Sequence, residues 1–263
     1  MNILFWNLKG NKNEKWIAEI IREKDVDIAV FAEYTTTVFE DVISNLENQY
    51  IQHDGNDGCD KISLLCKTNI QTIVRREQAR YTLYSCVANG NLYNIIGVHL
   101  PASPNSDEND RKEVIRDIVD DICEQENELK CRETIVIGDF NCNPFDNEII
   151  QKDSFNAVLY KSLIHQQETV IYHNKRKRRF YNPILHFISE STQTYGSFYY
   201  SSGIAPLYWN SFDQVLVRKE LVDKICSLEY IKSVNNKNLL KEVKPNSMIS
   251  DHLPLLVNIM EGE

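Results

Sequence analysis

The chain alternates short apolar runs with a few longer segments in which apolar residues recur every three or four positions. The short runs predict β-strands, and the longer segments predict amphipathic helices. Expected strands cover residues 3–7, 27–32, 62–66, 70–75, 81–88, 92–99, 134–137, 212–217 and 253–259. Expected helices cover residues 14–24, 37–47 and 107–129. Many hairpins with helices at intervals indicate an α+β sandwich rather than a strict βαβ repeat.

Asparagine marks two of the expected element ends. Asn13 directly precedes the helix over 14–24, where it is expected to act as the N-cap. Asn89-Gly90-Asn91 predicts a hairpin turn between two of the expected strands. Glycine is scarce, at nine residues, so most other turns are expected to use Asn, Asp and Ser.

Composition places the chain among ordinary globular proteins. Of its 263 residues, 42% are hydrophobic and 25% are charged. No Pro/Gly/Ser-rich linker, repeat or low-complexity tract marks a domain boundary. No run approaches the roughly 20 apolar residues that span a bilayer. The first residues lack a basic leader, so we expect no secretory signal and no membrane segment.

Cysteine usage and net charge narrow the possibilities further. The seven cysteines are widely spaced, with no C-x-x-C pair, which argues against a disulfide framework or a zinc site. A reducing cytoplasm is therefore the expected location. The net charge of −9 argues against a broad, nonspecific grip on nucleic acid. It does not exclude a nuclease, because divalent cations offset repulsion between two anions.

Polar residues gather at the ends of the expected strands, where catalytic groups commonly lie. Asp139 and Asn141 are two positions apart, so an extended chain points both to the same face. With Glu33 they offer oxygen ligands, which suit Mg²⁺ or Mn²⁺. Taken singly, each such residue could be a cap, a turn or a core histidine. The full set is Asn7, Glu33, His99, Asp139, Asn141, Asp213, Asp251 and His252.

Taken in order, these residues lie in segments that carry a family resemblance. The segments are W-N near the start, a Glu closing the second strand, V-H-L, G-D-F-N, F-D-Q-V-L and S-D-H-L-P. Together they resemble the endonuclease/exonuclease/phosphatase family, which includes pancreatic-type deoxyribonuclease, apurinic endonucleases, sphingomyelinases and inositol polyphosphate phosphatases. The resemblance runs from residue 3 to about 259. It implies one catalytic domain over 1–263, with the deoxyribonuclease-I-like four-layer sandwich of two packed, mostly antiparallel sheets flanked by helices.

The resemblance also implies a divalent-metal site. Glu33, with Asn7 nearby, would bind Mg²⁺ or Mn²⁺, and Asp251 would complete the metal or water network. The sequence departs from the common pattern at Ala32, where glutamine usually precedes the metal-binding Glu.

Roles in catalysis follow from the same resemblance. Asp139 and Asn141 would position or activate the attacking water and contact the scissile phosphate. His252, oriented by Asp213, would transfer a proton or polarise the phosphate. This division fits the chemistry, because a carboxylate beside an imidazole favours the imidazolium.

A second histidine–carboxylate pair is implied more weakly. His99 stands where the deoxyribonuclease and sphingomyelinase branches carry a histidine. Arg76-Glu77-Gln78-Ala79 resembles the family's R-E-P-A run, whose Glu pairs with that histidine. Glu77 with His99 would then mirror Asp213 with His252.

Two features bear on which phosphoester is hydrolysed. The first is a block of five cations, Lys175, Arg176, Lys177, Arg178 and Arg179, expected either as a solvated hairpin tip or as a substrate-binding loop on the active-site side. The second is a set of ten aromatics, which either extend the core or stack on bases. These are Phe180, Tyr181, Phe187, Tyr195, Phe198, Tyr199, Tyr200, Tyr208, Trp209 and Phe212.

Three functions remain open at this point. A metal-dependent phosphodiesterase acting on DNA or RNA is the first interpretation. The second is a hydrolase of a smaller phosphoester, such as a nucleotide, phosphoinositide or phospholipid headgroup. The third is a catalytically silent binding protein on the same fold. No protein partner can be inferred from the sequence.

Overall fold

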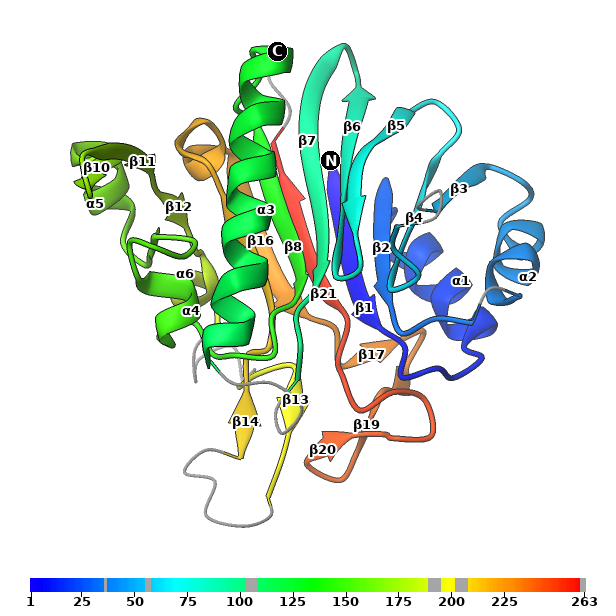
Figure 1. Cartoon of the computed structure of the whole chain (residues 1–263). Helices are drawn as coiled ribbons and strands as arrows, with labels where there is room; N and C mark the ends of the chain where they lie inside the picture. The colour runs from blue at the N-terminus through cyan, green and yellow to red at the C-terminus, as the bar shows by residue number, and fades with distance from the viewer. Residues whose placement is uncertain (36, 55–57, 103–107, 189–194, 202–207, 261–263) are drawn as a thin grey trace.

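The computed structural model describes residues 1–35, 37–54, 58–102, 108–188, 195–201 and 208–260. Within these residues, two β-sheets pack face to face and helices cover their outer faces (Figure 1). This arrangement confirms the expected four-layer sandwich. Both sheets mix parallel and antiparallel pairs.

The first sheet joins the two ends of the sequence. Its strand order is β16-β21-β1-β2-β4-β3. The strands are β1 (Asn2–Asn7), β2 (Ile28–Ala32), β3 (Tyr50–Asp54), β4 (Ile62–Lys67), β16 (Ile225–Tyr230) and β21 (Leu255–Ile259). β1 runs parallel to β2 and antiparallel to β21, so residues from both ends meet in one sheet.

The second sheet has the order β5-β6-β7-β8-β15-β12-β9. Its strands are β5 (Gln71–Gln78), β6 (Tyr81–Ala88), β7 (Asn91–His99), β8 (Thr134–Asp139), β9 (Ala157–Val158), β12 (Phe180–Tyr181) and β15 (Asp213–Val217). β7 and β8 are parallel at its centre, while β15 returns antiparallel to β8.

Helices and short ribbons complete the layers. α1 (Glu14–Glu23) and α2 (Val38–Asn45) cover the first sheet, and α3 (Glu108–Leu129) covers the second (Figure 1). Shorter helices are α4 (Asn147–Ile150), α5 (Lys161–Gln166), α6 (Ile184–Phe187) and η2 (Lys219–Lys224). The paired ribbons are β10 (Thr169–Tyr172) with β11 (Lys175–Arg178), β13 (Phe198–Tyr199) with β14 (Trp209–Asn210), β17 (Ser233–Val234) with β18 (Lys237–Asn238), and β19 (Leu240–Lys241) with β20 (Lys244–Pro245). No helix in the described part of the chain is long and apolar enough to cross a membrane.

The apolar runs are continuous because the central strands are buried on both faces. In β8, Ile135 and Ile137 face the core between the sheets, whereas Val136 faces the layer beneath α3. This alternation follows from the two-residue period of a strand. Full burial of one such side chain contributes about 1.5–3 kcal/mol. The central strands are therefore a rigid support for the residues at their ends.

The sequence predicts most of the longer elements and one hairpin turn, with two differences. Asn89 and Gly90 adopt positive φ angles of 48° and 80°, as a two-residue type I′ hairpin turn requires. Asn13 occupies the N-cap position but its side chain does not cap the helix; Nδ2 donates instead to the Ile249 carbonyl at 2.5 Å. The strands β3 and β16 were not predicted, because their partly exposed residues break the apolar pattern.

Candidate active site

Two parallel strand pairs place their carboxyl ends at the same edge of the sandwich. In the first sheet Asn7 lies opposite Ala32, and Glu33 follows directly. In the second sheet His99 lies opposite Asp139. Because parallel strands end at the same side, four polar side chains converge without any long loop.

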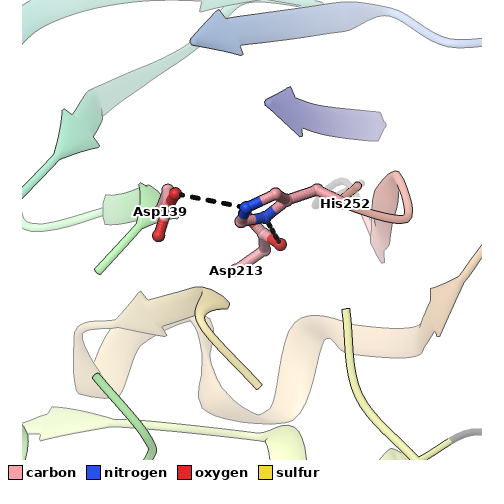
Figure 2. Close-up of side chains that lie close together, drawn as sticks. All are labelled: Asp139, Asp213 and His252. Atoms are coloured by element: carbon pink, nitrogen blue, oxygen red, sulfur yellow. Dashed lines mark hydrogen bonds and ion pairs between the residues drawn. The ribbon is translucent and has the colours of Figure 1, made fainter. Parts of the chain in front are cut away.

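A histidine–carboxylate pair faces Asp139 from the neighbouring strands. Asp213 opens β15 directly opposite Asp139. His252 Nδ1 lies 2.7 Å from Asp213 Oδ2, and its Nε2 lies 3.8 Å from Asp139 Oδ2 (Figure 2). All three side chains are buried. The imidazole is therefore held between two carboxylates.

The surroundings favour a protonated His252. Burial alone would lower its pKa, but the charges of Asp213 and Asp139 outweigh burial and raise the pKa to about 10. Burial also raises the pKa of Asp213, despite the opposing effect of His252. The pair thus holds a proton more tightly than either group would in water. A buried cation faces Asp139.

Backbone contacts fix the position of His252. Trp6 Nε1 donates to the His252 carbonyl at 3.0 Å. The His252 amide donates to Ser250 Oγ at 3.1 Å, and Ser250 Oγ donates to the Asn7 carbonyl at 2.7 Å. These bonds tie the S-D-H-L-P segment to the end of β1. They explain why residues so far apart in sequence share one site.

Asn7 and His99 hold two acidic groups side by side. Asn7 Nδ2 lies 3.0 Å from both Glu33 Oε1 and Asp139 Oδ2. His99 Nε2 lies 3.3 Å from Glu33 Oε1. The hydrogen bond from His99, helped by Asn7 and opposed by burial, lowers the pKa of Glu33 to about 2. Glu33 adopts a positive φ of 48°, an uncommon conformation that is often found at functional sites.

The G-D-F-N segment positions Asp139 by its backbone. A Cβ at Gly138 would lie 2.0 Å from the Val98 carbonyl oxygen, so only glycine allows this approach of β7 and β8. Asp139 Oδ1 accepts the Asn141 amide at 2.9 Å. Asn141 itself has a φ of 48° and donates through Nδ2 to the Leu100 carbonyl at 2.8 Å. Asn141 therefore orients the Asp139 carboxylate.

Two sets of side chains offer metal ligands. Asp139, Asp213 and His252 present donor atoms that all lie within 4.8 Å of one another. In this set, His252 Nδ1 is already paired with Asp213 Oδ2, and all three side chains are buried. The carboxylates of Glu33 and Asp139 are oxygen donors that suit Mg²⁺ or Mn²⁺. The Glu33 side chain is 42% exposed, so a hydrated cation can reach it.

Asp251 has a partner that the sequence did not reveal. Its Oδ2 lies 2.9 Å from Lys9 Nζ, where a metal ligand was expected. The Lys9 amide donates to Asn7 Oδ1 at 2.9 Å, which places the lysine beside the site. The only feature of the sequence that points to Lys9 is its position two residues after Asn7. The expected role of Asp251 in the metal or water network stays a prediction.

The expected Glu77–His99 pair does not form. Glu77 Oε1 accepts the Gly58 amide at 2.9 Å. His99 Nδ1 is buried and has no hydrogen-bond partner in the described part of the chain. The two histidines consequently differ: His252 is oriented by a carboxylate at Nδ1, whereas His99 bonds a carboxylate through Nε2.

The cationic block does not border this site, so the expectation of a loop on the active-site side is wrong. It forms β11 and the residue after it, just before β12. Tyr181 of β12 pairs with Val217, at the end of β15 away from Asp213. β10 and β11 accordingly lie at the opposite end of the sandwich (Figure 1). Arg178 forms an ion pair there with Glu168.

Comparison with known families agrees with this geometry. A sequence profile of the endonuclease/exonuclease/phosphatase family matches residues 4–252. The chain belongs to this family. Its members are hydrolases of phosphoric esters and generally depend on divalent metal ions. No curated protein sequence matches the chain significantly.

Solved structures of several relatives share the fold. Truncated TDP2 from Caenorhabditis elegans has a TM-score of 0.66 at 14% identity, covering 99% of this chain and 97% of that one. Danio rerio TDP2 complexed with a single-strand DNA product has a TM-score of 0.61 at 12% identity, covering 99% of both. A mannosyl-6-phosphatase from Bacteroides thetaiotaomicron has a TM-score of 0.63 at 13% identity, covering 99% and 100%. Identities this low support the common fold alone.

Proposed function

We propose that the protein is a divalent-metal-dependent phosphodiesterase that cleaves nucleic acid by attack of water on phosphorus. The observation that carries this proposal is the placement of His252 between Asp213 and Asp139. The buried His252 imidazole lies on one side of the Asp139 carboxylate, and Asn7 holds the Glu33 carboxylate on the other. Such an arrangement can bind a phosphate, accept a proton from water and return a proton to a leaving oxygen.

Glu33 and Asp139 would hold Mg²⁺ or Mn²⁺, and Asn7 keeps these two carboxylates in place. When bound, the cation would neutralise charge on the phosphate oxygens and favour ionisation of water. The low pKa of Glu33 keeps that carboxylate charged and ready to ligate.

The protein's own groups account for every proton. Asp139 takes a proton from the attacking water as the new oxygen–phosphorus bond forms. His252 donates its Nε2 proton to the leaving oxygen as the old bond breaks. Asp139 then returns its proton to His252, whose Nε2 lies 3.8 Å from Asp139 Oδ2. Acid–base catalysis of this kind contributes about 10²–10⁴-fold to the rate.

Nucleic acid as substrate is supported by one relative. The Danio rerio TDP2 structure, which shares this fold, holds a single-strand DNA product. The cationic block no longer supports this choice, because it lies at the opposite end of the sandwich. Recognition would therefore have to come from groups near the site.

A smaller phosphoester is the second candidate. The TM-score of the mannosyl-6-phosphatase, 0.63, lies between those of the two TDP2 structures, 0.66 and 0.61. One fold hosts many substrates, so overall similarity does not choose between them.

The seven unpaired cysteines are compatible with a reducing compartment, and we retain cytoplasmic location as a proposal.

A hydrolysis screen tests the proposed function. Purified protein is assayed with Mg²⁺ or Mn²⁺ on single- and double-stranded DNA, RNA, abasic DNA, nucleotides, phosphosugars and phosphoinositides. We expect cleavage of nucleic acid that EDTA abolishes. Calorimetric titration with Mn²⁺ should show binding that weakens in Glu33→Gln but not in the exposed control Glu47→Gln. Release of phosphate from phosphosugars alone would favour the second candidate, and binding unchanged in Glu33→Gln would refute the metal site.

A further inference from the structure

An aromatic hairpin is rooted on the candidate site. It comprises residues 195–201 and 208–212, including β13 and β14, and extends beyond the sheet ends (Figure 1). Ser197 Oγ accepts the Asp213 amide at 3.1 Å, and the Ser197 carbonyl accepts the Leu253 amide at 2.9 Å. Phe198 also forms a β-bridge with His252. The hairpin is thus fixed relative to both members of the catalytic pair.

The rings of the hairpin form two series of contacts, one at His252 and one farther along the hairpin. The Phe198 ring lies 4.9 Å from the His252 ring. Farther along, Tyr199 contacts Trp209 at 5.4 Å and Tyr208 at 6.0 Å between ring centroids. Tyr208 is 61% exposed, and its neighbours Tyr195 and Tyr200 are about half exposed. The first series therefore touches the His252 imidazole, and the second series, which starts at the next residue along β13, ends in exposed rings.

A shallow pocket lies beside this series. Its volume is about 270 Å³, and it is lined in part by Tyr195, Trp209 and Leu253, the residue after His252. This is slightly below the 300–1,000 Å³ of typical ligand sites, which suits a single ring system. Lys232 and Glu242 also line it.

The hairpin's described residues carry no charged side chain. In a chain of net charge −9, a polyanion gains little from the general field of this protein. Exposed rings beside a phosphate site offer another source of affinity. An unpaired base of any identity can stack on an aromatic side chain.

We propose that the aromatic hairpin is a stacking surface for unpaired bases next to the scissile phosphate. This inference rests on the proposed function and narrows its substrate to single-stranded nucleic acid or unpaired ends. Stacking would supply much of the binding energy, and the root on Asp213 and His252 would set the distance from base to phosphate.

Fluorescence anisotropy in EDTA tests binding without hydrolysis. The probes are a labelled oligothymidylate and a strand of equal length that is abasic at every position. We expect the wild-type protein to bind oligothymidylate on the order of tenfold more tightly than the abasic strand, and Tyr208→Ala to lose about tenfold for oligothymidylate only. Tyr208→Phe keeps the ring and should restore the affinity.

Tyr160→Ala is the matched control. Tyr160 is 67% exposed and precedes α5, which lies beside β10 and β11 (Figure 1). Its variant should bind like the wild type. Equal binding of both strands, equal loss in Tyr160→Ala, or absence of strand binding would each overturn the inference.

A separate assay isolates the proposed function. Metal-dependent hydrolysis of methyl p-nitrophenyl phosphate requires no base. If this diester is cleaved while oligothymidylate is not bound, the phosphodiesterase stands and the stacking surface falls. If the strand is bound by the hairpin but neither diester nor strand is cleaved with metal, the proposed function falls alone.

Discussion

Two hairpins of the second half of the chain, β10–β11 and β13–β14, differ in chemistry and in place. The β10–β11 hairpin carries the cationic block, yet it lies at the end of the sandwich away from Asp139. The β13–β14 hairpin has no described charged residue, yet it is bonded to Asp213 and bridges to His252. The more conspicuous hairpin in the sequence is the one that lies away from the site.

The difference teaches that strand register, rather than charge density, decides which hairpin lies at the candidate site. β12 pairs with the far end of β15 and carries the cationic hairpin with it. The Arg218 guanidinium anchors that region, because it pairs with Glu126 at 2.8 Å and lies 3.7 Å over the Phe180 ring. One end of the sandwich therefore holds the candidate site, and the other holds a buried ion pair.

The largest expected effect is a loss of kcat, and it is tested by replacing one histidine at each end of the sandwich. His252→Ala should lower kcat by about 10²–10⁴-fold, because the proton donor is lost. His165, which pairs with Asp223 at the cationic end, provides the control. His165→Ala should leave kcat within about twofold. Both kcat values are measured by steady-state kinetics on the substrate identified by screening. Equal losses of kcat in the two variants would contradict the placement of the site.

Removing the buried ion pair should affect stability rather than chemistry. Glu126 and Arg218 each have only 3% of the side chain exposed. Glu126→Ala should therefore destabilise the fold by about 3–5 kcal/mol, since it leaves Arg218 buried without its partner. Urea unfolding gives the value, while kcat per folded molecule should not change.

Glu128→Ala is the control for that experiment. Glu128 pairs with Arg76 at the surface, and exposed pairs contribute about 0–1 kcal/mol. A loss as large as that of Glu126→Ala would show that burial is not the deciding factor.

Salt dependence compares the two hairpins as binding surfaces. If stacking on the β13–β14 hairpin dominates, few phosphates are neutralised. Each neutralised phosphate contributes a slope of about −0.7 for single strands. Affinity for oligothymidylate should then fall less than about tenfold between 50 and 200 mM salt. A much steeper fall in affinity in the anisotropy titration would indicate that the cationic hairpin contributes to binding, contrary to this prediction.

The smallest effect is expected from neutralising the cationic hairpin itself. Lys175→Ser, Arg176→Ser and Lys177→Ser together remove three charges but spare the Arg178–Glu168 ion pair. Because β11 lies away from the site, KM and kcat should stay within about twofold. A KM increase above tenfold with unchanged kcat would contradict this expectation.

The sequence predicts the site well where a residue ends a strand. Asn7, Glu33, His99 and Asp139 could be found because apolar runs stop at them and parallel strands end together. The Lys9–Asp251 pair was missed because it joins two loops, and no periodicity relates loops to one another. The position of the cationic hairpin was also out of reach, since it depends on one cross-strand pair, Tyr181 with Val217.

Pairing of the first strand with the last has a consequence for synthesis. β1 lies between β2 and β21, so one edge of β1 stays open until residues 255–259 have left the ribosome. His252 precedes that strand by only a few residues, so it reaches Asp213 and Asp139 at the same late stage. A nascent chain therefore carries an unpaired apolar strand edge, which is a template for aggregation. Catalytic competence and protection of that edge should arise together, in a single late step of folding.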